Sequence, residues 1–195
     1  MCGSMRQPGL ASLVEAASTL LDRKVTVTRR AEQGNLIFSS TPGMRLNVLA
    51  YQRSDDDAEY KPVITAMWFG YGSDFSGFNA RYEGIATKPT WAEDFARRRC
   101  IVPTTAFKEA GVQFGRRDDD VMFFGAIFSK YQTQNIRHCS VITRNATDTI
   151  ASFHHRMPLP VDTEHADLWL NREHPLTAAE RLEMATITNQ VRVVG

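Results

Sequence analysis

The chain has 195 residues, of which 43% are hydrophobic, and its formal net charge is +1 at pH 7. A chain of this length can bury a sizeable core, and we expect one domain over residues 1–195. The small net charge means that any nucleic-acid contact requires a local basic cluster. No apolar run reaches the ~18 residues of a membrane-spanning helix, and no signal peptide is visible, so we expect a cytoplasmic protein.

Cysteine and histidine spacing bears on metal and redox chemistry. The three cysteines stand at positions 2, 100 and 139, without a Cys-x-x-Cys pair. Their odd number and wide spacing argue against a disulfide framework and against a zinc site. The histidines form no H-E-x-x-H pattern, so a zinc enzyme is the least favoured class. We expect neither a metal nor a cofactor.

The first predicted element is a helix. Apolar residues recur there at helical spacing: Leu10, Leu13, Val14, Ala17, Leu20 and Leu21. This periodicity predicts an amphipathic helix over about 10–22. Alternating apolar residues then predict strands around 25–27 and 46–50, and the segment 63–68 is typical of another strand.

Two further helices are indicated by their start signals. Thr90 followed by Glu93 has capping-box spacing and predicts a helix to about Arg98. Thr177 with Glu180 repeats the same spacing near the C-terminus.

Apolar runs at 121–128 and 139–142 predict buried strands, whereas the triplets Asp55–Asp57 and Asp118–Asp120 indicate solvated turns. The triplets lack the spacing of a calcium loop. Because strands and helices do not alternate regularly, the pattern favours an α+β domain.

The start of the chain carries the most specific chemical signal. Cys2 follows Met1 and precedes Gly3, and aminopeptidases remove methionine before a small side chain. The mature chain would then begin with a free α-amine of pKa about 7.7–8.0 and a thiol of pKa about 8.5 on one residue. An aldehyde that meets this pair forms an imine, which the thiol closes into a thiazolidine ring. The start therefore permits an aldehyde trap, but position 2 is weakly constrained in most proteins, so the rest of the chain must support this reading.

Three internal segments carry further candidate residues. They are Phe78-Asn79-Ala80-Arg81-Tyr82-Glu83; Arg99-Cys100-Ile101-Val102-Pro103 leading to Ala106-Phe107-Lys108-Glu109; and Phe153-His154-His155-Arg156-Met157-Pro158. Behind a Met-Cys-Gly start and in this order, they closely resemble the SOS-response-associated peptidase family. Its members carry N-A-R-S-E, R-C-L-I/V-P followed by F-Y-E-W, and H-x-R-M/R-P. The resemblance runs from Cys2 to about Pro158.

The resemblance implies both a fold and a function. Members of this family have a mixed domain with a strongly curved, barrel-like sheet flanked by helices and a positively charged groove. They capture abasic sites in single-stranded DNA as a covalent link through the N-terminal cysteine. The family name records an earlier proposal of self-processing peptidase activity. We therefore expect single-stranded DNA containing abasic sites as the partner of a monomeric, DNA-associated protein.

The family's reacting groups carry over where the motif letters coincide. Cys2 matches the nucleophile, and Asn79 matches the asparagine beside the trapped sugar. Glu109 matches the glutamate that opens the sugar ring and moves protons. His154 matches the histidine that assists formation or reversal of the imine. Such proton transfers suit a carboxyl group or an imidazole with a pKa near neutrality.

The family's DNA contacts carry over less uniformly. Arg81 and Arg156 match arginines that hold phosphates, and Trp68 matches a tryptophan near the groove. Arg98, in the run Arg97–Arg99, either adds basic density or complements the dipole of a helix end. Pro42 aligns loosely with a proline loop that props apart duplex junctions.

Four positions depart from the family pattern. Ser4 stands where an arginine is usual, Tyr82 replaces a small serine, and Lys108 and Ala110 replace the aromatic residues around the glutamate. The W-G-L-I-P-x-W stretch is reduced to residues 68–72. These changes indicate a divergent member.

Two alternatives come from other classes. As an amidohydrolase, the chain would use Cys2 with its own amine as base, although only Met1 precedes it, which leaves no propeptide to cleave. As a non-covalent binder of single strands, it would need only Arg81, Arg156 and the aromatic residues. A variant that lacks the Cys2 thiol separates these classes.

Overall fold

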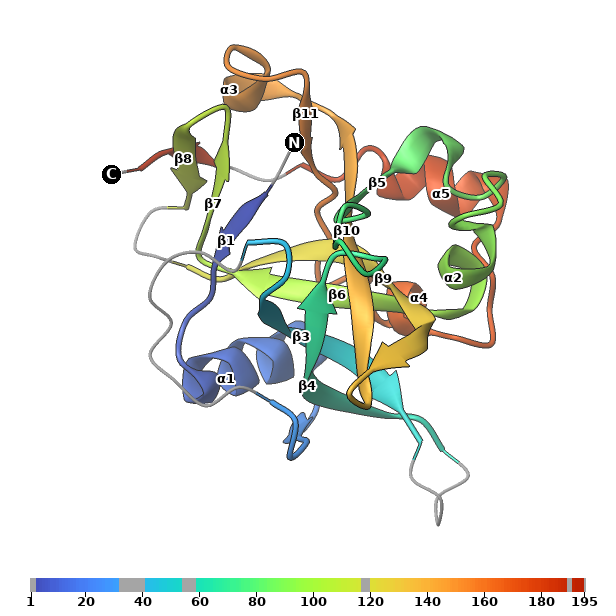
Figure 1. Cartoon of the computed structure of the whole chain (residues 1–195). Coiled ribbons are helices and arrows are strands. Elements are labelled where there is room, and N and C mark those ends of the chain that lie inside the picture. The colour runs from blue at the N-terminus through green and yellow to red at the C-terminus, as the bar shows by residue number, and fades with distance from the viewer. Residues whose placement is uncertain (1–2, 32–40, 54–58, 117–119, 189–190, 195) are drawn as a thin grey trace.

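The computed structural model describes residues 3–31, 41–53, 59–116, 120–188 and 191–194 (Figure 1). Cys2, the triplet Asp55–Asp57 and the first two residues of the triplet Asp118–Asp120 therefore lie outside the described residues.

The elements are distributed along the whole chain. In chain order they are β1 (Ser4–Arg6), α1 (Leu10–Leu21), β2 (Thr26–Val27), β3 (Arg45–Gln52), β4 (Lys61–Phe69), β5 (Asn79–Arg81), the 3₁₀ turn η1 (Tyr82–Gly84), α2 (Ala92–Arg97), β6 (Arg99–Thr104), β7 (Ala106–Glu109), β8 (Val112–Gly115), β9 (Met122–Thr133), β10 (Ile136–Asn145), α3 (Asp148–Ala151), β11 (Arg156–Pro158), α4 (Ala166–Leu170), α5 (Ala178–Met184) and β12 (Arg192–Val193). None of the helices in the described part of the chain has the length and apolarity needed to span a bilayer.

Five strands close into a barrel. β3 pairs with β4 and β6, β6 pairs with β9, and β9 pairs with β10, all antiparallel. A short parallel pairing of β10 with β4 closes the ring and makes the sheet mixed. Closure leaves these strands without a free edge along their paired lengths. The predicted α+β fold with a strongly curved mixed sheet is confirmed.

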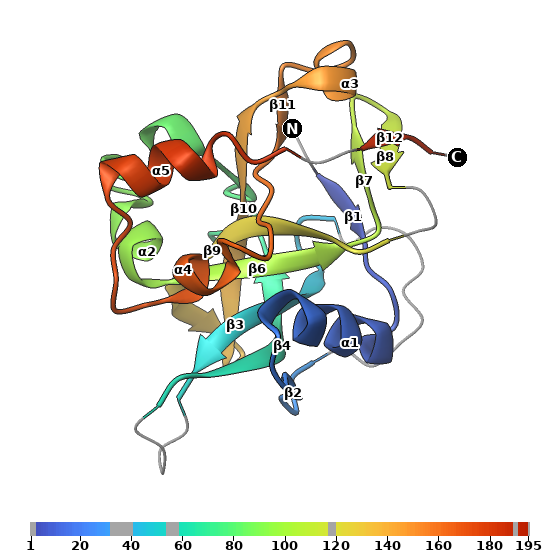
Figure 2. The ribbon, with the colours of Figure 1, turned by 180° about the vertical axis from the view of Figure 1, so that it is seen from behind.

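Both faces of the barrel strands are buried, in two separate clusters. Because side chains alternate between faces, Leu46, Val48 and Ala50 of β3 join one cluster, whereas Leu49 joins the other. The cluster that Leu49 joins also contains buried hydrophobic residues of α1, α2, α4 and α5, so it covers the outside of the barrel. Figures 1 and 2 show α1 against one part of the barrel wall and α2, α4 and α5 against another.

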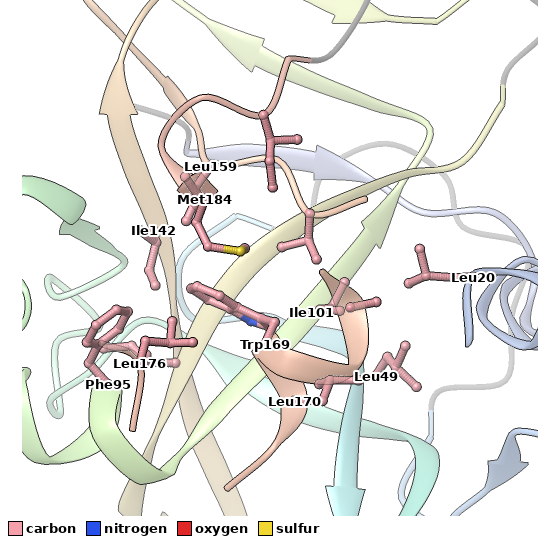
Figure 3. Close-up of a cluster of buried hydrophobic side chains, with 14 of the residues drawn as sticks. Leu20, Leu49, Phe95, Ile101, Ile142, Leu159, Trp169, Leu170, Leu176 and Met184 are labelled. Carbon is pink, nitrogen blue, oxygen red and sulfur yellow. The ribbon is translucent and has the colours of Figure 1, made fainter. Parts of the chain in front are cut away.

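Trp169 of α4 lies in the middle of the outer cluster (Figure 3). Its side chain is fully buried, and its indole Nε1 donates to the carbonyl oxygen of Cys100 at 2.8 Å. The ring also occupies the space beside Gly125 of β9, where an added Cβ would lie 2.7 Å from Cζ2 of the indole. Glycine at 125 therefore allows the helix to approach the strand closely.

Arg99 has a structural role that the sequence reading missed. Its side chain is 1% exposed, and its guanidinium group donates to five backbone carbonyls, namely those of Phe95, Ala96, Trp169, Asn171 and His174. Burial lowers the pKa of Arg99 to about 10. Of the two readings of the run Arg97–Arg99, basic density for DNA therefore does not apply to Arg99, which ties α2 to α4.

A second, smaller sheet lies beside the barrel in the order β1-β7-β8-β12 (Figures 1 and 2). β1 pairs antiparallel with β7, with Ser4 opposite Lys108 and Met5 opposite Phe107. Ala110 and Gly111, with φ angles of 50° and 80°, make the turn from β7 to β8. A two-residue turn with both φ angles positive suits the twist of a hairpin.

Several predicted elements are confirmed. The helix over 10–22 is α1, the strands around 25–27, 46–50 and 63–68 are β2, β3 and β4, and the apolar runs lie in β9 and β10. The capping box at Thr177 is also present.

The capping box predicted at Thr90 is wrong. α2 forms, but its N-cap is Trp91 and no side chain caps it. Glu93 instead accepts a hydrogen bond from Arg98 Nη2 at 2.8 Å, which draws its carboxylate away from the start of the helix.

Candidate active site

The candidate site is built around the C-terminal half of β10. On one edge, β5 pairs with it in parallel, which places Asn79 beside Val141 and Arg81 beside Thr143. On the other edge, β11 pairs with it antiparallel, which places Arg156 beside Asn145. The motif residues from two distant segments are therefore separated only by one strand.

Asn79 and Arg81 share one face of β5, because the residue between them, Ala80, points into the outer cluster. The Asn79 amide Nδ2 donates to the carbonyl oxygen of Phe78 at 2.8 Å. Arg81 is exposed. This edge of the site therefore presents a cation to solvent beside a partly buried amide.

Arg156 is buried, at 5% exposure, and holds a network of polar groups. Its guanidinium group donates to both carboxylate oxygens of Glu83, at 2.7 and 2.8 Å, and to Asn145 Oδ1 at 2.7 Å. Burial raises the pKa of Glu83, but the hydrogen bonds from Arg156 outweigh it and hold this pKa below its usual value. Its Nη1 and Nη2 groups donate to protein acceptors, whereas its Nε has no hydrogen-bond partner among the described residues. The phosphate contact predicted for Arg156 stays a prediction.

A pocket of about 490 Å³ opens over this part of β10. Its lining is Asn79, Arg81, Glu83, Gly84, Lys88, Trp91, Thr143, Asn145 and Arg156. Arg81 and Lys88 are its exposed cations. The sequence analysis did not select the pocket residues Glu83, Lys88, Trp91, Thr143 and Asn145. Of these five, only Glu83 lies in one of the three motif segments, so only Glu83 carried a sequence signal.

Glu109 and His154 form the second part of the site. Glu109, the last residue of β7, is 2% exposed, and its Oε1 lies 3.5 Å from Nδ1 of His154. The same Nδ1 accepts a hydrogen bond from the backbone N–H of Arg156 at 3.1 Å. The ring of His154 also contacts that of His155, with centroids 4.4 Å apart. A carboxyl group and an imidazole at this distance can exchange protons with a bound molecule.

Arg156 connects the two parts. Its side chain lines the pocket, and its backbone N–H bonds to His154, which faces Glu109. β1 leads to the same place, because Ser4 lies opposite Lys108, the neighbour of Glu109. The structure thus brings Asn79, Arg81, Arg156, His154 and Glu109 to one end of the barrel.

The other predicted DNA contacts lie apart from this pocket. Trp68 is opposite His138, five residues before Thr143 along β10, and its Nε1 donates to the Thr133 carbonyl at 3.3 Å. Pro42 belongs to a turn next to the end of β4, in which the N–H of Gly43 bonds to the carbonyl of Phe69 at 2.8 Å.

Arg98 is 9% exposed and is ion-paired with Glu93 and Asp94. The structure therefore gives its guanidinium group two carboxylate partners on α2, and its DNA contact stays a prediction.

The departures from the family pattern have structural consequences. Tyr82 is 8% exposed, and its hydroxyl donates to the carbonyl of Arg181 at 2.8 Å, so it anchors α5. Lys108 is exposed on the outer face of β7. Ala110 occupies the left-handed position of the β7–β8 turn.

Among the described residues, no group of three or more His, Cys, Asp or Glu side chains could hold a metal ion.

Solved structures share this fold across almost the whole chain. A protein from Bacteroides thetaiotaomicron superposes with a TM-score of 0.69 at 20% identity, covering 100% of this chain and 92% of that one. A phage-related protein from Bordetella bronchiseptica gives a TM-score of 0.70 at 18% identity, covering 99% and 94%.

Sequence relatives match more locally. Abasic site processing protein YobE of Bacillus subtilis (strain 168) is 26% identical over 105 residues, which are 48% of each chain. An abasic site processing protein of Saccharomyces cerevisiae is 24% identical over 115 residues, 54% of this chain and 31% of that protein. The match thus spans about half the length of the bacterial relative and less of the yeast one. The model of the family described as "SOS response associated peptidase (SRAP)" matches residues 1–194, and the chain belongs to this family.

Proposed function

We propose that the protein captures abasic sites in single-stranded DNA through a covalent bond to Cys2, after removal of Met1. The observation that carries the proposal is the pairing of β1 with β7, which places Ser4 opposite Lys108, the neighbour of Glu109, and Glu109 faces His154. Cys2 stands two residues before Ser4, and two residues span at most about 7 Å. The names of the curated relatives agree with an abasic lesion as the target.

The chemistry follows from the groups at this end of the barrel. An abasic deoxyribose is mostly a closed hemiacetal, and opening it requires a proton on the ring oxygen and removal of one from the C1′ hydroxyl. Glu109 and His154 would carry out these transfers. The Cys2 amine then adds to the C1′ aldehyde and water leaves, which gives an imine. The thiolate adds to the imine carbon while the nitrogen takes up a proton, so the thiazolidine forms with net loss of one water.

The pocket would hold the lesion and its neighbours. Asn79, which lines the pocket, would hydrogen-bond the sugar, and the exposed cations Arg81 and Lys88 would contact the flanking phosphates. Arg156 would act indirectly, because it fixes Glu83, Asn145 and the backbone bond to His154. We further propose that the chain works as a monomer and as one unit over residues 1–195.

The decisive experiment combines Cys2→Ser with an oligonucleotide that carries one abasic site. Wild-type protein should give a heat- and detergent-stable adduct whose intact mass equals protein without Met1 plus DNA minus one water. Cys2→Ser should give none, while Ser4→Ala, the matched neighbouring change, should retain the adduct.

Other outcomes would contradict the proposal. If Cys2→Ser formed as much stable adduct as the wild type, the Cys2 thiol would not be the trapping group. Tight binding of undamaged DNA without any adduct would identify a non-covalent binder. Cleavage of amide substrates that depends on Cys2, without an adduct, would identify an amidohydrolase, and release of a cleaved strand without a thiazolidine would identify a lyase.

A further inference from the structure

A cluster of arginines lies at the end of the barrel opposite the candidate active site. Arg137 stands near the start of β10, next to the β9–β10 turn, where it pairs with Gln132. Asn145, at the pocket, lies eight residues farther along the strand, or about 26 Å at ~3.3 Å per residue. Figure 1 shows β10 running between these two ends, with α3 and β11 at the pocket end. The cluster is therefore separate from the pocket.

Aromatic rings order the guanidinium groups of this cluster. Those of Arg137 and Arg172 both lie 5.4 Å from the centroid of the Phe128 ring. The ring of Tyr60 lies 5.0 Å from the guanidinium group of Arg172 and 5.7 Å from that of Arg53. Stacking of this kind fixes the plane of a guanidinium group without using its N–H donors.

The two central arginines have few polar contacts of their own. Arg137 Nη1 donates to the carbonyl of Ser129 at 3.2 Å, and Arg172 Nε donates to that of Arg97 at 3.1 Å. In the part of the chain that the structure describes, neither has a carboxylate partner. The nearby carboxylates of Glu93 and Asp94 are bound to Arg98. Most donors of Arg137 and Arg172 therefore have no protein acceptor among the described residues.

The charges in the cluster also oppose one another. Burial lowers the pKa of Arg137, and the neighbouring positive charges of Arg172, Arg98 and Arg30 lower it further, against a smaller opposing effect of Asp94. Burial also lowers the pKa of Arg172; Tyr60 opposes this shift, and Arg98 and Arg53 add to it. Half-buried like charges at close range destabilise each other until an anion joins them.

We propose that Arg137 and Arg172 form a second phosphate-binding site at this end of the barrel, which takes backbone phosphates of a nucleic-acid strand. Two stacked guanidinium groups offer paired donors of the kind that phosphate oxygens accept. The site requires neither an abasic lesion nor Cys2, so it goes beyond the proposed function. Small phosphate compounds present the same oxygens and are the second source to test.

The test uses undamaged, fluorescently labelled single-stranded DNA, with fluorescence anisotropy measured over a series of salt concentrations. Each lost phosphate contact should reduce the slope of log K against log salt by about 0.7. Arg137→Gln/Arg172→Gln should therefore reduce it by about 1.4. The matched control is Arg23→Gln/Arg116→Gln. It removes the same number of positive charges, but from two arginines that are ion-paired with Asp167 and Asp120. This control should leave the slope unchanged.

Two further measurements separate the sources and guard against misfolding. Inorganic phosphate is added to each variant and the thermal midpoint is recorded. Stabilisation of the wild type but not of the Arg137→Gln/Arg172→Gln variant, with equal DNA slopes, would assign the site to small phosphates and overturn the nucleic-acid assignment. Arg137→Lys/Arg172→Lys keeps both charges and should retain most of the wild-type slope even if the glutamine variant folds poorly.

The proposal is overturned if the wild type, the glutamine variant and the lysine variant share one DNA slope and one response to phosphate. Because the DNA carries no abasic site, failure of the covalent chemistry would not alter this result.

Discussion

The outer layer of the barrel and its pocket end both bury polar side chains, but they satisfy them differently. In the outer layer, Arg99 and the indole of Trp169 donate to backbone carbonyls. At the pocket end, Arg156 bonds to the side chains of Glu83 and Asn145, and Glu109 faces His154. Hydrogen bonds to the backbone fix the position of a helix, whereas hydrogen bonds between side chains set the protonation state and the orientation of reactive groups.

The difference separates stability from chemistry. A change in the outer layer should alter the free energy of unfolding and leave the reaction of folded molecules intact. A change at the pocket end should slow the reaction and leave the free energy of unfolding nearly unchanged.

Trp169→Ala should have the largest effect on stability. It removes a fully buried indole and opens a cavity beside Gly125, which should cost about 3–5 kcal/mol in the free energy of unfolding. Urea denaturation measures this loss. Leu182→Ala, at a position 71% exposed, is the control and should change stability little. If the folded Trp169→Ala protein also loses its DNA adduct, the two regions are not independent.

Glu109→Gln should have the largest effect on chemistry. It keeps the shape of the side chain but removes the proton exchange with His154, so the initial rate of adduct formation should fall about 10²–10⁴-fold. Quenched time courses with an abasic oligonucleotide measure the rate. The control Glu15→Gln removes an exposed carboxylate from α1 and should react at the wild-type rate. A rate within twofold of wild type for Glu109→Gln would remove this residue from the mechanism.

Thr177→Ala should cost about 1 kcal/mol, because it removes a helix cap. Thr177 Oγ1 accepts from the backbone N–H of Glu180, and the Glu180 carboxylate accepts from that of Thr177, which holds the pKa of Glu180 at about 2. The matched control is Thr90→Ala, since Thr90 has the same sequence spacing but caps no helix. Equal midpoints in urea for the two variants would contradict the prediction.

His165→Gln should have the smallest effect, below about 1 kcal/mol, and the effect should depend on pH. Burial lowers the pKa of His165, but hydrogen bonds and charges from Asp162 and Glu183 outweigh it and raise the pKa above 6.5. The wild type should therefore exceed the variant in stability below pH 6.5 and lose this advantage as pH rises through the folded pKa. Measuring the free energy of unfolding of both proteins from below pH 6.5 to above the folded pKa tests this. A wild-type advantage that grew with pH would contradict the prediction.

Elements with a local signal were predictable from the sequence. α1 has a regular apolar stripe, and the Thr177 box is complete within four residues, so neither depends on distant contacts. The Thr90 box failed because Arg98 and Lys130 compete for Glu93. The structural role of Arg99 was missed because the five carbonyls around it come from two distant stretches of the chain, 95–96 and 169–174.

The candidate site was predictable only in part. Motif letters selected Asn79, Glu109 and His154, and the structure places them at one end of the barrel, although their roles stay predictions. The curved sheet was expected from the resemblance alone, because its closure by β4 and β10 depends on strands far apart in sequence. Lys88 and Asn145 carried no signal, since they reach the pocket only through this closure.

The two buried cysteines have a practical consequence. Cys100 and Cys139 have no exposed surface, and burial raises the pKa of both thiols, that of Cys139 to about 12. A maleimide dye applied to the native protein should therefore label neither of them. Any dye that attaches under these conditions reports on position 2, so the N-terminal sulfur can be followed without engineering the rest of the molecule.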